Sequence, residues 1–86
     1  MNDVSVIIPT YYRDETLRAA IESVQRQTHK PIEIIVVDDS GERYAADIVT
    51  DLDVRYVAHQ TNRGGNPART TGFERSNGRY VQFLDD

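Results

Sequence analysis

The chain has 86 residues, 38% of them hydrophobic, and a formal net charge of −4. This length fits one small domain or part of a larger one, and excludes two domains. The acidic surplus argues against a nonspecific nucleic-acid binder, which needs a basic face to neutralise phosphates. With no cysteine there is no disulfide framework and no thiolate metal site. The start lacks the pattern of a secretory signal, and no apolar run approaches the roughly 20 residues that span a bilayer.

The first two expected elements are a strand and a helix. Residues 4–8 form a continuous β-branched run closed by Pro9, which predicts a strand buried on both faces of a parallel sheet. Asp14 is a plausible N-cap for a helix over residues 14–28. Its apolar residues recur at helical spacing: Leu17, Ala20, Ile21 and Val24.

The middle of the chain repeats this alternation. Residues 32–37 predict a second buried strand that ends in the acidic pair Asp38 and Asp39. Apolar residues at three- and four-residue steps over residues 44–52 predict a short second helix, and residues 54–58 predict a third strand.

The last third supplies one more helix and strand. After a polar loop over residues 60–65, Asn66 and Pro67 provide an N-cap and a proline at the first helical position. Asn77-Gly78 closes this helix, and residues 80–84 predict a fourth strand that runs into Asp85 and Asp86.

The order β-α-β-α-β-α-β predicts an α/β fold with a doubly wound, mostly parallel sheet. Ligands of such sheets bind outside the carboxyl ends of the strands, especially where the strand order reverses. Three segments are therefore candidate sites: residues 9–13, residues 38–41, and the final pair of acids.

The loop after the first strand, Pro-Thr-Tyr-Tyr-Arg, lacks the glycines of a dinucleotide fingerprint or a P-loop. Its tyrosines and Arg13 suit stacking of a base and contact with an anion. Two tyrosines that merely pack a loop are the equally weighted alternative.

The acidic pairs need partners, because carboxylates at the ends of apolar strands are costly to desolvate. A ligand N–H or hydroxyl could pair with Asp38 or Asp39, and capping of the next helix is the alternative. Asp85 and Asp86 offer hard oxygen ligands that suit Mg²⁺ or Mn²⁺ with phosphate oxygens completing the shell.

Five other residues leave alternatives open. His29 and His59 fit structural or solvated roles better than catalytic ones. Gly64-Gly65 could form a tight turn or admit a ligand closely. Arg69, in the first turn of the third helix, could face an anion or form a surface salt bridge.

Six segments together strongly resemble family 2 glycosyltransferases of the GT-A fold. They cover nearly the whole chain in the right order and spacing: VSVIIPTYYR (4–13), SVQRQT (23–28), EIIVVDDS (33–40), NRG (62–64), ARTTG (68–72) and GRYVQFLDD (78–86). Thr70 departs from the family pattern, where asparagine is usual, which puts the local loop geometry in doubt.

The resemblance implies the nucleotide-binding, Rossmann-like half of a GT-A fold. It implies an inverting glycosyltransferase of hexosyltransferase type that moves a sugar from a nucleotide-sugar, with UDP the expected nucleotide, to a carbohydrate or lipid-linked acceptor. The residues it assigns to nucleotide binding are Pro9, Thr10, Tyr11, Asp39, Arg69 and Asp85. Asp39 would accept a hydrogen bond from the base, and Arg69 would lie near the diphosphate or hold the adjoining loop.

The resemblance also assigns a divalent metal, Mg²⁺ or Mn²⁺, to the first acids of an Asp-x-Asp motif, Asp85 and Asp86. The second acid of that motif would be residue 87, so the metal site is expected to be incomplete here. We expect residues 1–86 to be the N-terminal part of the domain, catalytically inactive alone, with the acceptor site and catalytic base further on.

Further expectations concern location and assembly. We expect a cytoplasmic protein, with any membrane association provided by later sequence, and self-association through the open edge of the fourth strand, near Val81 and Phe83. One rival is a non-catalytic nucleotide-binding or regulatory module with a flavodoxin-like sheet. A nucleotidyltransferase, the other rival, would need a Gly-rich, lysine-bearing loop after the first strand.

Overall fold

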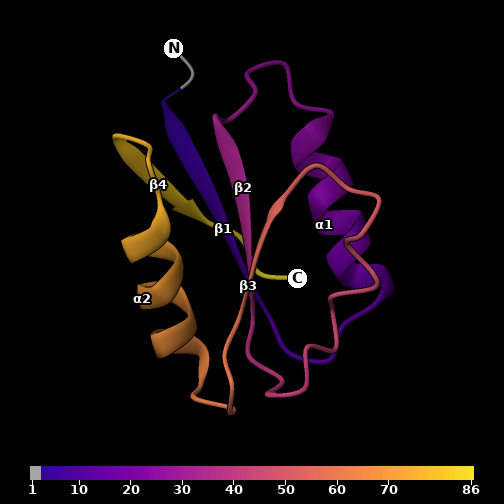
Figure 1. Cartoon of the computed structure of the whole chain (residues 1–86). Helices are drawn as coiled ribbons and strands as arrows, with labels where there is room; N and C mark the ends of the chain where they lie inside the picture. The colour runs from indigo at the N-terminus through magenta and orange to yellow at the C-terminus, as the bar shows by residue number, and fades with distance from the viewer. Residues whose placement is uncertain (1–2) are drawn as a thin grey trace.

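In the computed structural model, which describes residues 3–86, four parallel strands form one sheet in the order β3-β2-β1-β4. The elements in chain order are β1 (Val4–Thr10), α1 (Glu15–Gln25), β2 (Glu33–Asp38), β3 (Arg55–Ala58), α2 (Gly65–Arg75) and β4 (Tyr80–Phe83). Figure 1 shows α1 and α2 on opposite sides of the sheet. The predicted α/β class and parallel sheet are confirmed.

Two apolar clusters explain why the sheet is covered on both faces. Val6 and Ile8 pack with α1, whereas Ile7, between them, packs with α2. This alternation follows from the strand geometry, in which successive side chains point to opposite faces. Residues 5–8 of β1 are therefore all buried, as expected of a central parallel strand.

Close contact between α2 and β1 depends on Gly72. A Cβ atom on this residue would lie 2.4 Å from Cγ2 of Ile7, a distance that real Cβ atoms do not adopt. The missing side chain lets the helix backbone approach the sheet, and this brings the N-terminal end of α2 to the carboxyl ends of β1 and β2.

The helix predicted over residues 44–52 is wrong. Residues 44–51 form a series of turns, although Ala45 and Val49 are buried against the α1 face as their spacing indicated. Arg18 donates to the Ile48 carbonyl, which would accept from the Leu52 N–H in a helix, and the Leu52 N–H bonds to the Val49 carbonyl instead. Such side-chain bonds compete with the helical ladder.

The other predicted elements exist with shifted ends. The strand predicted over residues 4–8 continues through Thr10, and α1 ends at Gln25 rather than at residue 28. The N-cap of α2 is Gly64, with φ of 103°, and not Asn66. Pro67 still lies within the first turn, where its missing N–H costs nothing.

The strand order reverses between β1 and β4. From β1 the chain proceeds through β2 to β3 on one side, and β4 then pairs with the other edge of β1. The switch point therefore lies where Thr10 and the residues after β4 meet, which is the expected ligand position in such a sheet.

No helix among residues 3–86 is long and apolar enough to cross a bilayer.

Candidate nucleotide site

A cavity of about 330 Å³ lies at the carboxyl ends of β1, β2 and β4. All six residues predicted to bind nucleotide line it, together with Asp86, the anion candidate Arg13 and the glycine pair that could admit a ligand. The lining is Pro9, Thr10, Tyr11, Arg13, Asp39, Asn62, Gly64, Gly65, Ala68, Arg69, Asp85 and Asp86. Residues as far apart in the chain as Thr10 and Asp86, separated by 76 positions, thus line one cavity.

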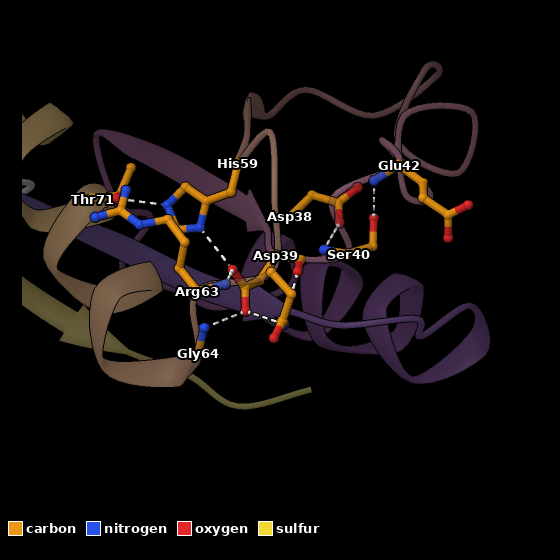
Figure 2. Close-up of polar contacts among 9 residues, drawn as sticks. Asp38, Asp39, Ser40, Glu42, His59, Arg63, Gly64 and Thr71 are labelled. Carbon is orange, nitrogen blue, oxygen red and sulfur yellow. Dashed lines mark hydrogen bonds and ion pairs between the residues drawn. The ribbon is translucent and has the colours of Figure 1, made fainter.

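The Asp39 carboxylate holds one side of this cavity through four hydrogen bonds. Its Oδ1 accepts from His59 Nδ1 and from the Arg63 backbone N–H, both at 2.8 Å. Its Oδ2 accepts from the Asn62 amide and the Gly64 backbone N–H, also both at 2.8 Å (Figure 2). A base N–H that reaches Asp39 has to share an oxygen with these donors or replace one of them.

Hydrogen bonds stabilise the ionised form of the Asp39 carboxyl. Burial alone would raise the pKa of this carboxyl, but the hydrogen bonds from His59 and the two backbone N–H groups outweigh it and hold the pKa below the usual range. The carboxylate is therefore ionised at neutral pH, and it fixes residues 62–64 as the wall leading into α2.

Asp38 holds the turns after β2 and not the cavity wall. Its oxygens accept from the backbone of Ser40 and Ala45 and from the Tyr56 hydroxyl. Burial tends to raise the pKa of Asp38, and these bonds more than offset that tendency. The alternative of capping the next helix does not apply, because residues 44–51 form turns; Asp38 instead fixes these turns and is not among the residues that line the cavity.

Asp85 and Asp86, the two acids after β4, also line the cavity. Asp85 pairs with Arg69 at 3.2 Å, and the Thr10 hydroxyl donates to Asp86. The Arg69–Asp85 pair is exposed, with 82% of the Asp85 side chain accessible, so it contributes little to stability and can be exchanged for ligand contacts. This pair joins α2 to the end of β4 across the cavity.

Tyr11, which lines the cavity, is the first of three tyrosines whose rings pack on one another. The Tyr11 ring, 54% exposed, packs edge-to-face on Tyr12 at 4.8 Å, and Tyr12 packs on Tyr44 at 4.9 Å. The Tyr12 hydroxyl donates to Glu42, which raises the pKa of Tyr12 to about 12. Tyr12 also holds a left-handed backbone, with φ of 55°. These contacts tie the loop after β1 to the turns after β2.

Asp85 and Asp86 are the candidate ligands of a divalent metal. Hard carboxylate oxygens suit Mg²⁺ or Mn²⁺, and Asp85 and Asp86 supply them beside the cavity. Residues 3–86 contain no group of three histidine, cysteine or acidic side chains placed to hold a metal. Two carboxylates still fit an ion that takes its remaining ligands from phosphate and water.

His29 and His59 differ in environment. His29 is exposed, whereas His59 is buried and contacts Asp39 and Thr71. The structural role predicted for His59 therefore has a definite partner, and this partner is a cavity residue.

Sequence reasoning gave no binding role to two lining residues, Asn62 and Ala68, and left such a role open for Gly64 and Gly65. All four gain their positions from the path of the chain between β3 and α2. The Asn-Arg-Gly segment was the available signal, but its link to Asp39 spans more than 20 residues and appears only in the folded chain.

A larger cavity, of about 490 Å³, lies at the amino ends of the strands. Its lining includes Lys30, Ile32, Asp53 and Arg55, and none of the predicted site residues. Ligands of parallel α/β sheets bind at the carboxyl ends, so we assign the site to the smaller cavity.

The family model described as "Glycosyl transferase family 2" matches residues 5–86. The chain is 36% identical to a "GalNAc(5)-diNAcBac-PP-undecaprenol beta-1,3-glucosyltransferase" of Campylobacter jejuni, covering 100% of this chain and 30% of that protein. It is 39% identical to the "UDP-Glc:alpha-D-GlcNAc-diphosphoundecaprenol beta-1,3-glucosyltransferase WfaP" of Escherichia coli, covering 99% of this chain and 35% of WfaP.

A solved structure agrees in fold. The "Mannosyltransferase PcManGT from Pyrobaculum calidifontis in complex with GDP-Man and Mn2+" matches with a TM-score of 0.76 and 25% identity, over 96% of this chain and 27% of that one. The chain thus spans about a third or less of the length of these three proteins. The match over residues 5–86, with the GT-A likeness, shows that the chain belongs to glycosyl transferase family 2.

Proposed function

We propose that the chain binds the nucleotide of a UDP-sugar in the cavity at the carboxyl ends of β1, β2 and β4. The protein of which these residues form the donor half would transfer a hexose, with inversion, to a carbohydrate or lipid-linked acceptor. The observation that carries the proposal is the convergence of six nucleotide-binding candidates on one cavity. The names of WfaP and the Campylobacter relative support a glucosyl donor and a diphosphoundecaprenol-linked acceptor.

In this proposal Tyr11 stacks on the base and Pro9 and Thr10 line the nucleoside pocket. Asp39 accepts from a base N–H, and the side-chain amide of Asn62 is the donor that can rotate away to make room. Arg69 leaves Asp85 to meet the diphosphate, because a guanidinium matches phosphate oxygens in a bidentate manner. Asp85 then contacts the ribose.

Asp85 and Asp86 would also hold a divalent ion, Mg²⁺ or Mn²⁺. The ion would neutralise charge on the departing diphosphate. The similar mannosyltransferase was solved as a complex with GDP-Man and Mn²⁺, which supports this part of the proposal.

The acceptor site and catalytic base are proposed to lie outside residues 1–86. This chain covers only 35% and 30% of the two family relatives, which supports placing the acceptor site and the base in other parts of the protein. The 86-residue chain would then bind nucleotide without turning over a UDP-sugar. We propose a cytoplasmic location, where nucleotide-sugars serve as donors, with any membrane association supplied by other parts of the protein.

Replacement of Tyr11 by alanine tests the proposed stacking. We expect UDP to bind the wild-type chain and to bind Tyr11→Ala about tenfold more weakly, because stacking of a base on an aromatic ring contributes roughly 1–3 kcal/mol. Isothermal titration calorimetry measures both dissociation constants. Tyr80→Ala is the matched control, since Tyr80 is as exposed (58%) but lies at the amino end of β4.

Absence of UDP binding to the wild-type chain would contradict the proposed function. Equal affinity of wild type and Tyr11→Ala would leave the function standing and remove the stacking role.

The edge of β4 is a proposed self-association surface. β4 pairs only with β1 within residues 3–86, and Phe83 is 44% exposed on it. An open strand edge with apolar residues pairs readily with another chain. We expect sedimentation velocity to give masses above the monomer that rise with concentration, and Phe83→Lys to restore the monomer.

Phe73→Lys serves as the control for this experiment, because Phe73 is 60% exposed but lies on α2. If both lysine variants abolish association, general hydrophobicity and not strand pairing is responsible. A monomer mass at every concentration for the wild type would rule out the proposal.

A further inference from the structure

A chain of three hydrogen-bonded side chains runs from the cavity to the middle of α2. His59 Nδ1 lies 2.8 Å from Asp39 Oδ1, and His59 Nε2 lies 2.7 Å from Thr71 Oγ1. Figure 2 shows the imidazole between the carboxylate and the threonine. Only 6% of His59 and 4% of Asp39 are exposed, so water does not replace the contact between these two, whereas Thr71 is partly buried.

The chemistry of the partners fixes the neutral ring in one tautomer. An ionised carboxylate can only accept, so His59 Nδ1 carries the hydrogen and donates to Asp39. Nε2 then accepts from the Thr71 hydroxyl, which α2 holds in place. The ring is therefore anchored at both ends, and it fixes the direction in which the Asp39 carboxylate faces.

The orientation of Asp39 decides the shape of the cavity wall. Its oxygens accept from the backbone N–H groups of Arg63 and Gly64, and Gly64 is the N-cap of α2. Gly64, Gly65 and Arg69 all line the cavity. A rotation of the carboxylate would release this loop and the first turn of α2 together.

We propose that His59 is a positioning residue of the nucleotide site, which sets Asp39 and through it the loop that closes the cavity. The inference rests on the proposed function for the identity of the ligand. His59 does not line the cavity. Its influence on binding is therefore indirect and passes through the Asp39 carboxylate.

A core histidine with no link to the site would predict a loss of stability alone. A positioning role predicts in addition a loss of affinity in folded molecules, with rescue by any side chain that keeps an N–H donor toward Asp39. Asparagine is such a side chain, because its amide nitrogen takes a place near that of Nδ1. Phenylalanine keeps the ring volume and donates nothing.

The experiment compares His59→Phe, His59→Asn, Thr71→Val and wild type, with UDP as the probe and calorimetry as the readout. Folding of each variant is first verified by circular dichroism. We expect about tenfold weaker binding for His59→Phe, since it removes the buried one of the four donors that hold the Asp39 carboxylate. We expect His59→Asn to bind within about threefold of wild type. His29→Phe, at an exposed histidine, should bind as wild type does.

Amide hydrogen exchange of Arg63 and Gly64 in the free chain gives a second readout that needs no ligand. Exchange should be faster in His59→Phe and unchanged in His59→Asn. Should His59→Phe fail to fold, Thr71→Val decides, because it keeps the ring and removes one anchor; we expect faster exchange and about threefold weaker binding.

Wild-type affinity in folded His59→Phe, or in Thr71→Val where His59→Phe does not fold, would overturn the positioning role and leave the proposed function intact. If the wild-type chain does not bind UDP, the proposed function fails. The exchange rates then decide separately whether His59 fixes the loop, and unchanged rates in His59→Phe or Thr71→Val would overturn that as well.

Discussion

Replacement of Asp39 by alanine should lower the free energy of unfolding by about 3 kcal/mol, because it removes a carboxylate that accepts from one buried and three partly buried donors. His59 Nδ1 and the backbone N–H groups of Arg63 and Gly64 lose their acceptor, whereas the Asn62 amide keeps the Asp39 carbonyl. Each buried and unpaired donor costs roughly 1–3 kcal/mol, and relaxation of the loop toward water recovers part of this. Urea unfolding at neutral pH measures the change.

Asp47→Ala is the matched control, because Asp47 is an exposed carboxylate on the turns after β2. Its unfolding free energy should stay within about 0.5 kcal/mol of wild type. A loss below about 1 kcal/mol for Asp39→Ala would show that water satisfies the loop, and the assignment of Asp39 as the support of the cavity wall would need revision.

Acid should destabilise the chain through Glu33, at the start of β2. Burial by itself would raise the pKa of this carboxyl, but hydrogen bonds from Ser5, Asn77 and Arg55 lower it from 4.5 to about 2. Because the folded-state pKa is depressed, the stabilisation is fully present above pH 4.5 and is lost as the pH falls toward 2. The total is on the order of 3 kcal/mol.

Urea unfolding at several pH values between about 5 and 2 measures this loss. Glu33→Gln removes the titrating group, so its stability should fall less steeply over the same range. Asp38 and Asp39 also have lowered pKa values and leave some acid sensitivity in the variant. Parallel curves for wild type and Glu33→Gln would assign the acid sensitivity to those other carboxyls.

The strands, and the convergence of the candidate site residues on one cavity, were predictable because they depend on local pattern and on one rule of topology. The β-branched runs around Ile7 and Ile35 are buried on both faces. Parallel strands bring their carboxyl ends to one edge, and so Thr10, Asp39 and Asp85 meet at one cavity although the chain separates them widely.

The backbone structure of residues 44–51, after β2, could not be predicted from the spacing of apolar residues. The spacing of Ala45 and Val49 predicted burial correctly, but it could not show that Asp38, Ser40 and Arg18 would capture nearby backbone groups. The Arg18 bond joins residues that are 30 apart in the chain, and their proximity depends on the folded sheet. The same reason hides the four donors of Asp39 from sequence analysis.

The most direct test of the central claim is the position of UDP on the chain, mapped by amide chemical-shift changes in an isotope-labelled sample. We predict that the largest changes fall on Thr10, Tyr11, Gly64, Gly65 and Asp85, around the cavity at the carboxyl ends of the strands. Changes confined to Lys30, Ile32 and Arg55, around the larger cavity at the amino ends, would contradict the assignment of the site.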